Sequence, residues 1–180
     1  MMRAALPIIA VVSGACAAPP GAAFSTDPRL GVSFEAPGGL RLRPCREGES
    51  SLPQQCLAFT SPGPSEEPAL MLEVREAPLE QVARDEAGFE PTESGEWRTT
   101  FGRFEPVAVE RFKAGALAGM RATVACGVSD ENGFHAAAGA CLTVLLSDGA
   151  RSVIITNDGR EGTLEQAQAL AESLRLLPKP

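Results

Sequence analysis

Apolar and polar residues alternate along much of the chain with the period of two that is typical of β-strands. The clearest strands are instead two β-branched apolar runs, Cys141–Ser147 and Arg151–Thr156, which flank Asp148-Gly149. Asp-Gly between two apolar runs predicts a two-residue hairpin turn. Because both runs are largely apolar on both faces, we expect these strands in the centre of a sheet. Other strands are predicted within Leu30–Arg43, around a Pro-Gly-Gly turn, and at Leu57–Thr60, Ala69–Arg75, Glu96–Phe101, Val107–Phe112 and Met120–Cys126.

Apolar residues recur at helical spacing in two places. The first is Pro78–Ala87, where proline occupies the first turn. The second begins at Thr163, where Gln166 completes a capping box, and it continues to Leu177 before Pro178 ends it. The order of strands, helix, strands and helix predicts an α+β fold. In such a fold a mostly antiparallel sheet packs against two or more helices, here including a C-terminal helix.

Residues 1–16 have the pattern of a bacterial signal peptide. One positive charge at Arg3 precedes a short apolar run, and small residues follow that run. The run is shorter than the ~20 apolar residues that span a bilayer. We therefore expect this leader to direct export into the periplasm and then to be cleaved.

Two kinds of cleavage fit the leader. Ser13-Gly14-Ala15-Cys16 is similar to a bacterial lipobox, in which Cys16 is lipidated and becomes the new N-terminus. Gly14 and Ala15 fit that pattern, whereas Ser13 departs from it. Ala15-Cys16-Ala17 also fits the A-x-A site of ordinary signal peptidase, whose product would be a soluble secreted protein. We favour lipidation at Cys16, which would be the only attachment to a membrane.

Length and composition suit one domain behind this leader. Pro, Gly and Ala dominate residues 17–29, which predicts a flexible linker, and residues 30–178 are long enough for a single domain. The chain has 16 basic and 23 acidic residues and a net charge of −7. Phosphate groups would be repelled by this charge, so we do not expect a nucleic-acid partner.

Once Cys16 is set aside, the other cysteines of the chain are Cys45, Cys56, Cys126 and Cys141. In an oxidising compartment they imply two disulfides, drawn from three pairings. The pairs Cys45–Cys56 and Cys126–Cys141 close the short loops. The second pair has independent support, because Asp130-Glu131-Asn132-Gly133 between the two cysteines is a hairpin turn signal. Folding there would bring Cys126 and Cys141 close to opposite each other on adjacent antiparallel strands.

The sequence offers little sign of catalysis or metal binding. His135 is the only histidine, and no nucleophile, phosphate-binding or dinucleotide motif accompanies it. No C-x-x-C occurs, and the oxygen-bearing run at residues 130–132 lacks the EF-hand spacing. We therefore expect no catalytic residue, no bound metal and no cofactor. Aromatic side chains could line a ligand groove, although core positions are favoured for them: Trp97, Phe101, Phe104 and Phe112.

Residues 30–178 combine an opening strand that ends in Pro37-Gly38, a mid-chain helix, a long antiparallel meander and a closing helix that runs into Ser173–Leu177. This layout resembles the PsbP-like (Mog/PsbP) family, which includes the DcrB-type lipoproteins. Members of that family are mainly binding, assembly or chaperone-like modules. The resemblance therefore implies a non-enzymatic role, and it supplies no catalytic residues.

Together these observations predict a periplasmic protein, anchored by lipid or soluble, that works as a binding or assembly module of the cell envelope. It would present a sheet face or a sheet edge to a protein partner. The alternative is a small periplasmic hydrolase, which would require a deep pocket with clustered titratable groups.

Overall fold

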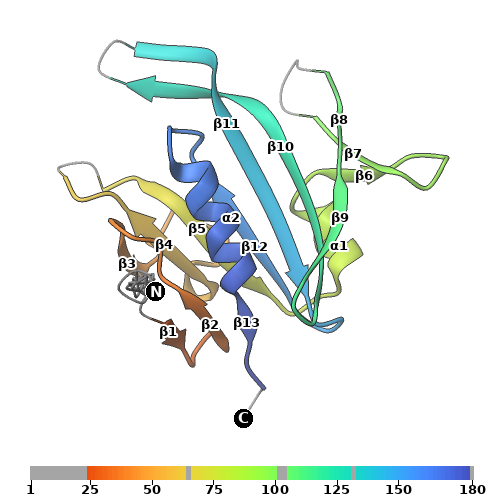
Figure 1. The fold of residues 1–180 in the computed structure, drawn as a ribbon, viewed down its shortest axis with the longest axis horizontal. Coiled ribbons are helices and arrows are strands. Elements are labelled where there is room, and N and C mark those ends of the chain that lie inside the picture. Colours follow the sequence, from red (N-terminus) through yellow and green to blue (C-terminus); the bar gives the residue numbers. More distant parts are fainter. Residues whose placement is uncertain (1–23, 64–65, 101–104, 131–132, 179–180) are drawn as a thin grey trace, which may run out of the picture.

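The computed structural model describes residues 24–63, 66–100, 105–130 and 133–178, with two α-helices and a short 3-10 helix among many strands (Figure 1). The helices are α1 (Leu79–Asp85), α2 (Thr163–Ser173) and the 3-10 turn η1 (Pro53–Gln55). The strands are β1 (Phe24–Asp27), β2 (Val32–Glu35), β3 (Arg41–Pro44), β4 (Cys56–Thr60), β5 (Pro68–Arg75), β6 (Phe89–Pro91), β7 (Trp97–Thr99), β8 (Val107–Ala108), β9 (Glu110–Ala114), β10 (Leu117–Asp130), β11 (Gly133–Ser147), β12 (Ser152–Asn157) and β13 (Arg175–Leu176).

One seven-stranded antiparallel sheet organises the described residues, with the strand order β3-β4-β5-β12-β11-β10-β9. The predicted central hairpin is confirmed: β11 and β12 pair with each other and have neighbours on both sides. The predicted two-residue turn at Asp148-Gly149 is wrong, because Ser147 pairs with Ser152 and residues 148–151 connect the two strands. Two small three-stranded sheets accompany the large one, with the orders β1-β2-β13 and β6-β7-β8.

Each face of the large sheet carries its own apolar cluster. On the first face, α2 and β2 cover side chains of β4, β5, β11 and β12, and the rings of Phe34 and Phe59 meet edge to face at 5.6 Å. On the second face, α1 and the β6-β7-β8 sheet cover Met120, Leu145 and Ile154. Successive side chains of a central strand point to opposite faces of the sheet and so enter the two clusters in turn. Both faces are buried, which is why these strands are apolar throughout.

The predicted α+β class is wrong, because strands make up 51% of the structure and helices only 15%. The two α-helices span seven and eleven residues and do not form a helical layer. Much of the additional strand content lies in β10 and β11, which are 14 and 15 residues long. Small residues such as those of Ala136–Ala140 extend these strands well beyond the apolar runs on which the prediction was based. The protein is therefore mainly β, with one helix near its C-terminus.

The C-terminal helix is shorter than predicted. It ends at Ser173, and Leu174 is already extended with φ −64° and ψ 138°. Arg175 and Leu176 then pair with Ser33 and Val32 as strand β13. Backbone pairing with an available strand edge thus replaces the last helical turn. At the other end, Thr163 is not the cap, because Gly162 holds that position in the left-handed conformation.

Part of the predicted linker is also ordered. Phe24–Asp27, expected within the flexible residues 17–29, form β1 and pair antiparallel with β2. The side chain of Asp27 accepts a hydrogen bond from the N–H of Leu30 at 3.0 Å, which closes the turn between the two strands. The predicted signal peptide, Cys16 and the start of the linker lie outside the described residues.

Candidate functional site

A two-stranded arm is the most distinctive surface feature. β9 pairs with β10 only along Leu117–Arg121, and β12 pairs with β11 only along Thr143–Ser147. Beyond those limits β10 and β11 have only each other as strand partners within the described residues. We call residues 122–130 of β10 and 133–142 of β11 the arm. Figure 1 shows it rising past the other strands and bending near its tip.

A disulfide joins the two strands of the arm. Cys126 and Cys141 are bonded with their Cα atoms 5.7 Å apart. In the register, Cys126 lies opposite Gly139 and Cys141 lies opposite Val124. The two cysteines are therefore diagonal neighbours on adjacent antiparallel strands, close to opposite each other as the spacing around the turn predicted. The offset arises because β11 has more residues than β10 between the disulfide and the tip.

That extra length is a bulge. The register shifts between Cys126 and Val128, so that Gly127 on β10 faces the longer segment 136–138 on β11. Bulges of this kind bend a strand pair and increase its twist, which explains the bend seen in Figure 1. Past the bulge, Val128 pairs with His135, and Asp130 pairs with Gly133 on either side of the predicted turn.

The base of the arm is fixed by the segment that follows β12. The buried Asn157 accepts a hydrogen bond from the N–H of Leu142 at 2.5 Å, and its own amide donates to the carbonyl of Ala140 at 3.0 Å. The same amide donates to the hydroxyl of Thr163 at 2.9 Å, in the first turn of α2. The N–H of Ala140 donates to the carbonyl of Gly159 at 3.2 Å. These groups occupy the outer edge of β11 where β12 leaves it.

Close packing accompanies these hydrogen bonds. A Cβ atom added at Gly159 would lie 2.5 Å from Sγ of Cys126 and 3.0 Å from Sγ of Cys141. Gly159 also has φ +80°, a conformation that glycine adopts without strain. The backbone after β12 therefore lies directly against the disulfide, and the base of the arm cannot move independently of α2.

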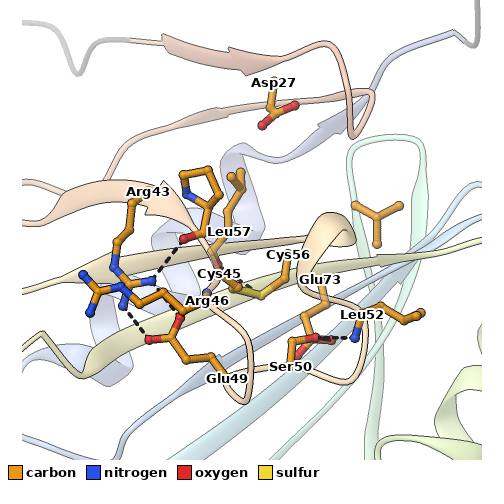
Figure 2. Close-up of a disulfide and its surroundings, with 12 residues drawn as sticks. Asp27, Arg43, Cys45, Arg46, Glu49, Ser50, Leu52, Cys56, Leu57 and Glu73 are labelled. Atoms are coloured by element: carbon orange, nitrogen blue, oxygen red, sulfur yellow. Dashed lines mark hydrogen bonds and ion pairs between the residues drawn. A yellow bond between two sulfur atoms is a disulfide. The ribbon is translucent and has the colours of Figure 1, made fainter.

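The other disulfide, between Cys45 and Cys56, holds a polar loop beside the opposite end of the sheet (Figure 2). Within this loop Glu49 receives two hydrogen bonds from the guanidinium of Arg43, at 2.6 and 2.7 Å. Glu49 also accepts from the backbone N–H of Arg46 at 2.7 Å. The hydrogen bonds from Arg43, helped by that of Arg46, hold the pKa of Glu49 at about 2, below its ordinary 4.5.

A chain of polar contacts leads from this loop to α1. Ser50 donates to Glu73 at 2.9 Å, and the buried Arg75 binds both Glu73 and Glu86. The Nη1 of Arg75 also donates to the carbonyl of Val74 at 3.1 Å. Buried charges with several fixed partners are typical of structural networks. We infer that this cluster has a structural role, which is to attach the loop and α1 to β5.

The predicted aromatic candidates do not form one groove. Trp97 is buried in the second-face cluster, where the guanidinium groups of Arg84 and Arg111 lie 5.9 and 5.8 Å from its ring. Phe112 packs against the first-face cluster instead. Phe101 and Phe104 lie outside the described residues. Trp97 and Phe112 therefore pack into two different apolar clusters, one on each face of the large sheet.

No catalytic constellation is assembled in the described part of the chain. The shallow, open hollow beside α1 has a volume of about 580 Å³, and its lining, which includes Leu79, Glu80, Arg84 and Arg111, offers no nucleophile. His135 lies exposed near the tip of the arm. Between residues 24 and 178, as far as they are described, no three His, Cys, Asp or Glu side chains are placed to hold a metal. The same residues include no helix with the length and apolar character needed to cross a bilayer.

Comparison with known proteins adds a likeness of fold. The chain matches no protein-family model and no curated protein sequence. Its structure is similar to that of cyanobacterial PsbP (CyanoP) from Synechocystis sp. PCC 6803, with a TM-score of 0.50 and 12% identity over 91% of this chain and 98% of that one. It is also similar to a protein from Bacteroides thetaiotaomicron VPI-5482, with a TM-score of 0.52 and 8% identity.

These two likenesses define a fold and not a family. The match to the Bacteroides protein covers 87% of this chain and 48% of the other, so this chain spans about half the length of that structure. The match to cyanobacterial PsbP extends over nearly the whole of both chains. The chain therefore has a PsbP-like fold, as the resemblance in its sequence led us to expect.

Proposed function

We propose that this protein is a non-enzymatic binding or assembly module of the cell envelope, which holds a protein partner on an edge of its arm. It would work in the periplasm and be attached to a membrane by a lipid on Cys16. Support for a location outside the cytoplasm comes from the two disulfides, because such bonds persist in oxidising compartments.

The observation that carries the proposal is a contrast between edges of the same sheet. Edge strands are normally protected from pairing with other chains by charged residues or proline. β3 has this protection in Arg41, Arg43 and Pro44, and β9 has it in Glu110, Arg111 and Lys113. Residues 122–129 of the arm contain no charged residue and no proline.

Rigidity supports the same function. Strand addition is favoured when the receiving edge is already ordered, because less conformational entropy is lost on binding. The disulfide, Asn157 and Gly159 order the base of the arm before any partner arrives. A flexible hairpin would lose more conformational entropy on binding, and its edge would therefore bind a partner more weakly.

Chemical crosslinking in intact producing cells tests this function. Crosslinked peptides should connect the arm to another protein, and a matched chain with Cys126→Ser and Cys141→Ser should give fewer of these products. Crosslinks that reach only the β3 or α1 side of the molecule would contradict the proposal. Mass spectrometry of the membrane fraction tests the anchor: a diacylglyceryl group on Cys16 is expected, and a soluble form beginning after Ala17 would exclude it.

A further inference from the structure

The two edges of the arm differ in what their backbone groups can still bind. In an antiparallel pair, opposite residues either exchange both hydrogen bonds or direct all their N–H and C=O groups away from each other. The N–H groups of Ala140 and Leu142 donate to Gly159 and Asn157, away from β10. Their pairs across the arm are therefore of the second kind.

Those opposite residues are Ala125, which faces Ala140, and Thr123, which faces Leu142. Each must direct its N–H and its C=O to the outer edge of β10. Both residues are exposed, and their outward groups have no hydrogen-bond partner in the described residues. On β11 three of the corresponding groups are already occupied: the N–H of Leu142 and the carbonyl of Ala140 bind Asn157, and the N–H of Ala140 binds the carbonyl of Gly159.

Among the described residues, no strand of the chain occupies this edge. β9 pairs with β10 as far as Arg121, which faces Glu110. The preceding residue, Val109, turns away because its N–H donates to the carbonyl of Trp97 at 2.8 Å. A strand from another polypeptide at Thr123 and Ala125 would therefore continue the line of β9 along the same sheet.

We propose, on the basis of the function inferred above, that the partner contributes an extended, uncharged segment that pairs with β10 along residues 122–126, where Thr123 and Ala125 supply the backbone hydrogen bonds. The segment is uncharged because residues 122–129 offer no charge to pair with one buried beside them. The small exposed side chains of Thr123 and Ala125 allow a neighbouring strand to approach. Val124, half-buried on the other face, provides an apolar contact.

The test uses the full chain in its producing cells, with the photo-crosslinker benzoylphenylalanine in place of Ala125. Thr123→Pro removes one outward N–H without removing a bond between β10 and β11. Its matched control is Ala136→Pro on the opposite edge of the arm. The crosslinked product is expected to fall about tenfold with Thr123→Pro, because pairing at this edge is lost, and to be unchanged with Ala136→Pro.

If Thr123→Pro does not fold, as judged by circular dichroism and by loss of the disulfides, Thr123→Lys serves instead, because a charged edge residue also opposes pairing. A product unaffected by either change would overturn the edge assignment while leaving the binding function. If only Ala136→Pro removed the crosslinked product, the edge assignment would also be overturned, because the partner would then pair with β11. A product with twice the mass of this chain would show that a second copy occupies the edge, and absence of any product at this position would also overturn the inference.

Discussion

The carbonyl of Gly159 accepts a hydrogen bond from Ala140 at 3.2 Å, and this contact ties the segment after β12 to the outer edge of β11. It is made directly beside the Cys126–Cys141 disulfide, so a covalent bond and a backbone contact fix the same point of the arm. The arm therefore extends from a rigid base rather than from a hinge.

Gly159→Ala should destabilise the protein by more than the strain of a positive φ alone. Gly159 and Gly162 have nearly equal φ values, +80° and +78°, but a Cβ at Gly162 would meet nothing within 4 Å. We expect about 1 kcal/mol of destabilisation for Gly162→Ala, and about 2 to 4 kcal/mol for Gly159→Ala, which also presses on the two sulfurs. Urea unfolding of both variants measures the difference. Equal losses would show that the disulfide does not depend on this close approach.

Asn157→Ala should loosen the base of the arm. It leaves the N–H of Leu142, the carbonyl of Ala140 and the hydroxyl of Thr163 without their common partner. We expect a loss of about 2 to 3 kcal/mol in the free energy of unfolding and faster hydrogen exchange at Leu142. Asn157→Asp is the control, since it keeps the acceptor for Leu142 but loses both donated bonds. Unchanged exchange at Leu142 in Asn157→Ala would refute the role given to this side chain.

Removing the arm disulfide should have a local effect as well as a global one. Cys126→Ser with Cys141→Ser opens a link across 15 residues, for which chain entropy predicts about 3 kcal/mol. Cys45→Ser with Cys56→Ser opens a link across 11 residues, and is expected to cost a comparable amount. Only the first change should accelerate hydrogen exchange at Ala122 and Val124, whose amides are directed to β11. If both double variants accelerated exchange there, the Cys126–Cys141 disulfide would have no specific local effect on the arm.

The Glu49–Arg43 pair should make stability depend on pH in the acid range. Because the pKa of Glu49 is lowered in the folded protein to about 2 from 4.5, its contribution is complete above 4.5. It is lost as the pH falls through about 2. The difference in unfolding free energy between the parent and Glu49→Gln should therefore shrink over that interval. A difference that stays constant across the interval would show that Arg43 does not stabilise the ionised carboxylate.

Local pattern predicted the strands and helices better than it predicted their extent. The continuous apolar runs Cys141–Ser147 and Arg151–Thr156 predicted a central hairpin because both strands are buried on both faces. The alanines and glycines of residues 133–140 have no comparable pattern, so the length of β11 depends on its pairing with β10. The same reason applies to Arg175 and Leu176, whose strand exists only because β2 offers them an edge.

Part of the candidate site could be predicted from the sequence. The spacing of Cys126 and Cys141 around a turn signal indicated a stapled hairpin, and the structure joins the same two pairs of cysteines that the short loops favoured. The bulge at Gly127 and the contacts of Asn157 and Gly159 could not be predicted, because they bring together residues from β10, β11 and the segment after β12. Only this arrangement distinguishes the outer edge of β10, with which no described strand pairs beyond Arg121, from the occupied edge of β11.

Hydrogen exchange of the native complex, isolated after mild crosslinking, tests the central claim most directly. The amides of Thr123 and Ala125 should exchange rapidly in the free protein and slowly in the complex, because the partner's backbone accepts their hydrogen bonds. If these two amides exchange equally fast in both states while amides elsewhere on the surface become protected, the partner does not bind at the outer edge of β10.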